Sequence, residues 1–173
     1  MSGIFKRFWR ESDAVAAIEA ALIFPLLLAM LLGVFDMGNA ILMNQKTIRA
    51  SQVTADLISR NRSVDAAIVS EAVEAGRLAF APRSSEGYGY DIVSIRFDAA
   101  GSPQIVWRET DGMVPMASVL NDVMALSEPG NGVLVVGVEY EFHPTFAGFI
   151  MNTFLMREIA FARGRKSPVV AYE

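Results

Sequence analysis

The residues that could do chemistry are few, and three of them lie on one predicted strand. The single histidine, His143, follows Glu139 and Glu141 at two-residue steps, so all three side chains point to the same face of a strand. Together they could bind a cation, but the chain has no cysteine and no second histidine to complete a metal site or a proton relay. We interpret them as the solvated side of an edge strand, and predict no catalytic site, no metal and no other cofactor.

Phosphate-binding and nucleic-acid-binding sites are not expected either. Residues 87–90 read Gly-Tyr-Gly-Tyr, but the helix and the lysine that follow a phosphate-binding loop are missing. The net charge of −4 argues against nucleic acid as a partner. We therefore predict a protein that is not an enzyme and has no nucleic acid partner and no small-molecule substrate.

One carboxylate, Glu19, is the only charged group between residues 14 and 35. A carboxylate at the centre of a membrane helix costs about 2.5–3.5 kcal/mol and less near its ends, so such a residue usually marks a function. If the chain is cut between Ala14 and Val15, the new amine of Val15 and the carboxylate of Glu19 lie four residues apart on one helix face. That pairing, within one chain or to a neighbouring chain, would neutralise both charges. The alternative is that Glu19 simply lies at headgroup depth.

The element that carries Glu19 is the apolar stretch of residues 14–35. As a helix it would be about 33 Å long, enough to cross the roughly 30 Å hydrocarbon core of a bilayer. The leader of residues 1–13 contains three basic residues, Lys6, Arg7 and Arg10, which favour a cytoplasmic amino terminus. We therefore predict a single-pass protein of the bacterial inner membrane with a periplasmic carboxyl-terminal domain.

A cleavable secretory signal is the competing interpretation of this stretch. Its apolar region is usually shorter and ends in a small-x-small site, whereas here only Gly38 and Ala40 offer small residues after the apolar run. Pro25 interrupts the stretch and predicts a kink, which a membrane helix tolerates when the freed backbone group finds a partner. A retained helix is the interpretation that we adopt.

Residues 6–40 resemble the amino terminus of the TadE-like family of tight-adherence pilus assembly proteins. A basic leader precedes a small residue, four mostly apolar residues, a glutamate and a long apolar helix. The positions that carry the resemblance are Ala14, Glu19, Pro25, Gly33, Asp36 and Gly38. The departure is Ala14, where members cleaved by the prepilin peptidase favour glycine. Residues 133–163 resemble the carboxyl-terminal half of such proteins more weakly.

The resemblance implies a structural function, as a minor pseudopilin or an inner-membrane assembly factor of a tight-adherence, type IV-related pilus. It implies that Ala14 and Val15 form a candidate prepilin-peptidase junction, and that Glu19 guides recognition and subunit register. The implied partners are the lipid bilayer, a prepilin peptidase, and other pilus assembly proteins or pseudopilins, including another TadE-like chain. The alternative function is an unprocessed, membrane-anchored periplasmic module that binds a ligand or an envelope partner.

The fold class that we predict is α+β, with a long transmembrane helix that continues into a small domain built on an antiparallel sheet, a pilin-like plan. The chain divides into a leader (1–13), a transmembrane helix (14–35) and an extracytoplasmic domain (36–173). Apolar residues at three- and four-residue steps after residue 39 indicate that the helix continues to about Arg60 and packs on the domain.

The remaining elements follow from periodicity and turn residues. A second helix is expected from an N-cap at Ser63 to about Phe80, and a short helix after Pro115. Alternating patterns predict strands at residues 91–98, 104–109, 132–143 and 154–163, with the last two paired. The tail, residues 164–173, is expected to fray.

An apolar loop follows the third strand. Phe146, Phe149 and Ile150 make residues 144–152 more apolar than a solvent-exposed loop usually is. The loop is therefore a candidate interaction site that meets the bilayer or a partner subunit. The alternative is that it packs on the core of its own domain.

Overall fold

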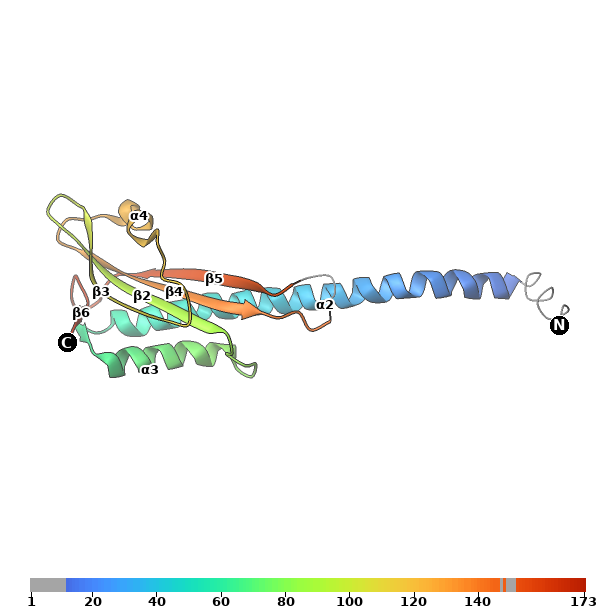
Figure 1. Cartoon of the computed structure of the whole chain (residues 1–173). Coiled ribbons are helices and arrows are strands. Elements are labelled where there is room, and N and C mark those ends of the chain that lie inside the picture. The colour runs from blue at the N-terminus through green and yellow to red at the C-terminus, as the bar shows by residue number, and fades with distance from the viewer. Residues whose placement is uncertain (1–11, 147, 149–151) are drawn as a thin grey trace. The chain divides into compact units, whose positions relative to one another are not determined.

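The structure, a computed structural model, describes residues 12–146, 148 and 152–173. Its elements, in chain order, are α2 (Ser12–Ser59), β1 (Ser63–Val64), α3 (Ala66–Arg77), η1 (Leu78–Phe80), β2 (Tyr88–Phe97), β3 (Pro103–Asp111), α4 (Val119–Asp122), η2 (Met124–Leu126), β4 (Gly132–Phe142), β5 (Phe154–Ala162) and β6 (Ala171–Tyr172) (Figure 1). This order confirms the α+β class, with a long amino-terminal helix followed by a small sheet domain. Two compact units divide the chain, one of Met1–Ala40 with Pro144–Asn152 and one of Ile41–His143 with Thr153–Glu173.

The first part of α2 exposes its apolar side chains. Every residue from 15 to 28 is exposed, and Leu22 is 74% exposed although it is a large aliphatic side chain. Among the described residues, α2 is the one helix that is long and apolar enough to cross a membrane. Nothing else in the described chain covers this surface, and an exposed apolar surface of this kind is compatible with a membrane anchor.

The second part of α2 has one buried face. Met43, Thr47, Ala50, Thr54 and Ile58 are all at most 1% exposed, and their three- and four-residue steps place them on one side of the helix. Helix α3 approaches this face closely. The hydroxyl of Thr54 donates a hydrogen bond to the Ala72 carbonyl at 3.2 Å.

The sheet has four antiparallel strands in the order β3-β2-β4-β5. Figure 1 shows α3 and the carboxyl-terminal part of α2 on one side of the sheet and α4 on the other. Strand β4 is therefore covered on both faces, which explains why its residues 132–139 are buried one after another. The predicted pairing of the last two long strands is confirmed: Val136 of β4 lies opposite Ala160 of β5.

The α4 side of the sheet carries a separate hydrophobic cluster. It joins alternate residues of β2 and β4 to the segment that contains α4: Val93, Ile95, Phe97, Met116, Val119, Val123, Val133 and Val135. Each of these side chains is at most 4% exposed. The α4 segment is thus part of the core and not a mobile lid.

The carboxyl-terminal tail is ordered, so the prediction that it frays is wrong. Strand β6 pairs in parallel with β1, and Val170 just before it is 2% exposed. The Val170 carbonyl accepts hydrogen bonds from the Ser94 hydroxyl at 2.8 Å and from the Trp107 indole at 2.9 Å. These bonds reach across the sequence and have no local signature, which is why periodicity did not indicate them.

Two helix predictions also need correction. Ser63 is not an N-cap, because it belongs to β1; the N-cap of α3 is Asp65, whose carboxylate accepts the Ile68 N–H at 2.8 Å. The helix expected after Pro115 is reduced to the short α4 and η2. Its first turn is lost because the Met116 N–H and carbonyl are both bonded to side chains of the sheet.

Candidate functional site

The predicted cleavage junction lies at the start of α2. Ala14 and Val15 are both helical, and Val15 is 49% exposed. Glu19 is one turn further along and is exposed. In the described part of the chain Glu19 forms no ion pair, so an added amine at Val15 or a group on another protein is free to pair with it. Cleavage at this junction stays a prediction.

Further along α2, the helix continues through Pro25 to Ser59. The kink predicted at Pro25 stays a prediction. A Cβ placed on Gly33 or Gly38 would meet nothing within 4 Å, so both positions leave room for the close approach of another helix.

Asp36, which follows the apolar stretch directly, connects α2 to the segment after β4. Its side chain is fully buried. Its two carboxylate oxygens accept the backbone N–H groups of Thr145 at 3.0 Å and of Phe146 at 2.8 Å. In the sequence analysis Asp36 was singled out only as one of the positions that carry the family resemblance. Its contact with residues 145 and 146 spans more than 100 positions of the chain, so the local sequence could not predict it.

Of the three residues predicted for the interaction loop, Phe146 is described and Phe149 and Ile150 lie outside the described residues. The ring of Phe146 meets the ring of Phe35 edge to face, with centroids 5.3 Å apart. Phe146 is still 45% exposed, and Phe35 is 52% exposed. The two rings therefore form an apolar surface that is only partly covered.

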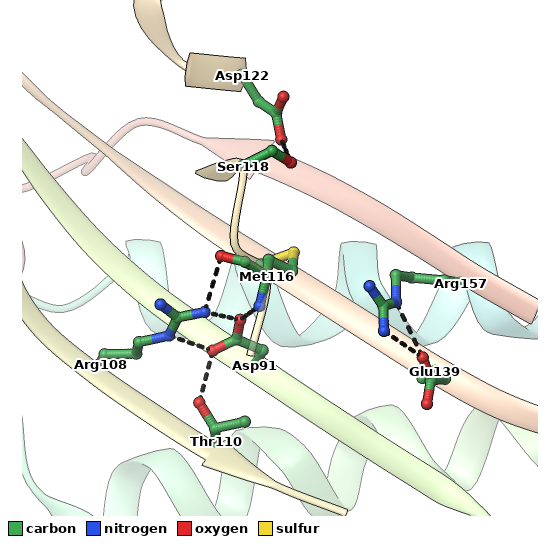
Figure 2. A network of polar contacts seen from close by, with 8 residues as sticks. All are labelled: Asp91, Arg108, Thr110, Met116, Ser118, Asp122, Glu139 and Arg157. Carbon is green, nitrogen blue, oxygen red and sulfur yellow. Dashed lines mark hydrogen bonds and ion pairs between the residues drawn. The ribbon is translucent and has the colours of Figure 1, made fainter. Parts of the chain in front are cut away.

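The two carboxylates of β4, Glu139 and Glu141, and His143 just after the strand have different surroundings. Glu139 is only 7% exposed and accepts two hydrogen bonds from the Arg157 guanidinium of β5, at 2.9 and 2.6 Å (Figure 2). His143 is exposed and Glu141 is partly exposed, and the His143 Nε2 atom lies 3.9 Å from a carboxylate oxygen of Glu141. The prediction of a solvated edge strand is therefore wrong for Glu139, because β4 lies inside the sheet and β5 supplies its partner.

The most connected polar group is Asp91 of β2, which is fully buried (Figure 2). Its carboxylate accepts hydrogen bonds from Arg108 at 2.9 and 2.5 Å, from the Thr110 hydroxyl at 2.7 Å and from the Met116 N–H at 2.7 Å. Arg108 also donates to the Met116 carbonyl at 3.1 Å. The network fixes the segment before α4 to the sheet.

The electrostatics of Asp91 match a structural role. Burial alone would raise the pKa of its carboxyl group, but the hydrogen bonds from Arg108, Met116 and Thr110 outweigh burial and hold the pKa below its usual range. The carboxylate is thus kept ionised and its acceptor positions are used within the domain. Sequence reasoning missed this network, since Asp91 was seen only as the first residue of a strand; a charged residue amid a buried strand was the available signal.

No group of three or more metal-binding side chains that could hold an ion occurs among the described residues. Exposed apolar side chains lie instead on α2 and on the segment after β4 that Asp36 binds through Thr145 and Phe146. The described surface offers a long apolar helix with one exposed carboxylate, Glu19, in its apolar stretch.

Comparison with known proteins identifies the family that this helix resembles. Residues 14–56 match the family model described as TadE-like protein, which confirms the resemblance found in the sequence. The match lies entirely within α2 and does not extend to the sheet. No curated protein and no solved structure matches the chain. Members of the TadE-like family are pilus components.

Proposed function

We propose that this chain is a non-enzymatic, single-pass component of a tight-adherence pilus, acting as a minor pseudopilin or as an inner-membrane assembly factor. The observation that carries the proposal is the division of α2 into an exposed apolar part and a part buried in the sheet domain. The family match at residues 14–56 spans both parts. An anchor and a domain joined by one helix suit a subunit that must be held in the membrane before assembly.

The charge distribution supports an orientation with the leader (1–13) in the cytoplasm and residues 36–173 in the periplasm. Lys6, Arg7 and Arg10 precede the apolar stretch, while acidic residues outnumber basic ones after it. Basic residues next to a first apolar helix are retained on the cytoplasmic side. The transmembrane part is then residues 14–35.

Glu19 supplies the specific interaction in this proposal. It is exposed on α2 and has no ion-pair partner among the described residues, so its charge is costly inside a bilayer until it is paired. The partner is the amine of Val15 if the chain is cut after Ala14, or a cationic group of a neighbouring pilus protein. Pairing of this kind sets the register of one subunit against the next.

Pilus assembly in cells that lack the chain tests this proposal. The cells are given back the wild-type chain, Glu19→Gln or, as a matched control, Glu71→Gln on the exposed face of α3. We expect all three chains in the membrane fraction at similar amounts, and pili with the wild type and Glu71→Gln but not with Glu19→Gln. The neutral amide keeps the size of the side chain and removes its charge.

Two results would contradict parts of this account. Normal piliation with Glu19→Gln would mean that the carboxylate lies at the interface without a role in assembly. Normal piliation in cells without any copy of the chain would remove the pilus function itself and leave an anchored interaction module.

A further inference from the structure

The contacts of Asp36 fix where residues 145 and 146 lie along α2. Asp36 is the first residue after the apolar stretch, and it holds the N–H groups of Thr145 and Phe146 at 3.0 and 2.8 Å. Phe146 contacts Phe35, the last residue of that stretch. All four residues belong to one compact unit. The segment after β4 therefore lies level with the end of the proposed membrane helix.

These contacts also remove an obstacle to placing the segment against lipid. A backbone N–H without a hydrogen-bond partner costs roughly several kcal/mol in hydrocarbon, because no water is there to accept its hydrogen bond. The N–H groups of Thr145 and Phe146 are both satisfied by one buried carboxylate, that of Asp36. This part of the backbone consequently needs no water for those two donors.

The side chains of the segment are compatible with lipid. The sequence has no charged residue from 144 to 156, and Phe146 remains 45% exposed beside Phe35 at 52%. Two exposed aromatic rings in contact at the end of an exposed apolar helix continue its surface. A protein without a membrane would leave this surface in water, which soluble proteins avoid.

We propose that the described residues of this segment, 144–146 and 148, form a second membrane-contacting element, which inserts into the headgroup and acyl-chain boundary of the bilayer next to the end of α2. The occupant of this surface is lipid, because the surface continues the apolar helix and carries no charge for a protein or nucleic acid partner to match. The inference rests on the proposed membrane anchor at residues 14–35. Asp36 acts as a positioning residue that sets the depth of the segment.

Spin labels on single cysteines in the full chain test whether the segment after β4 contacts the membrane. Since the chain has no cysteine, Gly148→Cys, Leu27→Cys and Ser102→Cys each give one labelled position, in vesicles of phosphatidylethanolamine and phosphatidylglycerol. Collisions with oxygen report lipid, and collisions with a water-soluble nickel chelate report water. We expect the Leu27 position deep in lipid, the Ser102 position in water, and the Gly148 position about 5–10 Å into the boundary region.

A variant of the positioning residue sharpens the test. In Asp36→Ala the label at Gly148 is expected to lose oxygen contact and gain nickel contact, while the label at Leu27 is unchanged. Asp36→Asn keeps one acceptor oxygen, so the oxygen and nickel accessibility of its Gly148 label is expected to lie between those of the wild type and Asp36→Ala. The Gly148 label reports the depth of one segment. The Leu27 label is the control, because it reports whether the anchor itself has moved.

Each outcome has one meaning. A Leu27 position in water would overturn the membrane anchor and this inference with it. A Leu27 position in lipid with the Gly148 position open to nickel would overturn this inference alone. A Gly148 position closed to both reagents would mean that protein, from this domain or a second copy, covers the segment, and would also overturn the inference.

Discussion

Two stretches of the same helix have opposite surroundings. In α2, residues 15–28 are all exposed and mostly apolar, whereas Met43, Ala50 and Ile58 are buried by the sheet domain. The helix does not break between them. The two stretches therefore share one backbone conformation and differ in what their side chains contact.

The two stretches differ in the size and placement of their side chains. The first has large aliphatic residues around its circumference, a pattern that suits lipid on every side. The second has one buried face, on which the small residues Ala50 and Thr54 lie where α3 packs. A Cβ added at Gly76 of α3 would lie 2.4 Å from the Thr54 hydroxyl oxygen. Close helix packing thus covers the second stretch, whereas residues 15–28 are exposed.

The largest predicted effect contrasts a buried carboxylate of the domain with the exposed one of the anchor. Asp91→Ala leaves Arg108 without its partner and is expected to lower the free energy of unfolding of the domain by about 3–5 kcal/mol. Glu19→Ala is expected to leave it unchanged. Trp107 fluorescence during urea unfolding, in a Trp9→Phe background in detergent micelles, measures both.

The same carboxylate makes the domain sensitive to acid. Because the pKa of Asp91 is lowered in the folded state, its stabilisation is present above the unfolded pKa of about 3.9 and is lost as the pH falls through the folded value. The wild-type domain should therefore lose more stability than Asp91→Ala below about pH 4. Equal acid sensitivity of the two chains would contradict the network in Figure 2.

A smaller effect compares the same substitution in the two stretches of α2. Ile58→Ala opens a cavity in the core and is expected to cost the domain about 2–5 kcal/mol, since Ile58 is 0% exposed. Ile23→Ala, at 52% exposure, should not change domain unfolding. The same fluorescence assay applies, and a matching loss for Ile23→Ala would show that the first stretch also packs on the domain.

Local pattern was sufficient for the long helix and the four long strands, and insufficient for the short elements and for the contacts that join distant segments. The extent of α2 and the four long strands follow from periodicity within each segment. The pairs β1–β6 and Asp36 with Thr145 and Phe146 connect distant parts of the chain, and nothing at either end indicates the other. Glu139 was predicted to be exposed to solvent because only the alternation of polar and apolar residues along the strand was considered.

The burial of Glu139 had a signal in the sequence that was not used. Residues 132–138 are apolar or glycine at every position, the pattern of a strand covered on both faces. That pattern indicates an interior strand, and an interior strand requires a neighbour on each side. Arg157 on β5, opposite Glu139 in the register, is the partner that such a neighbour supplies.

The mature amino terminus tests the central claim, that α2 is retained as a membrane anchor of a pilus component. Mass spectrometry of the protein from membranes is expected to show a chain that begins at or before Val15. A chain that begins at Val15 is expected for a processed pseudopilin, and an intact Met1 or Ser2 for an unprocessed assembly factor or a membrane-anchored interaction module. A chain cut after Gly38 or Ala40 would have lost the anchor and would contradict the account.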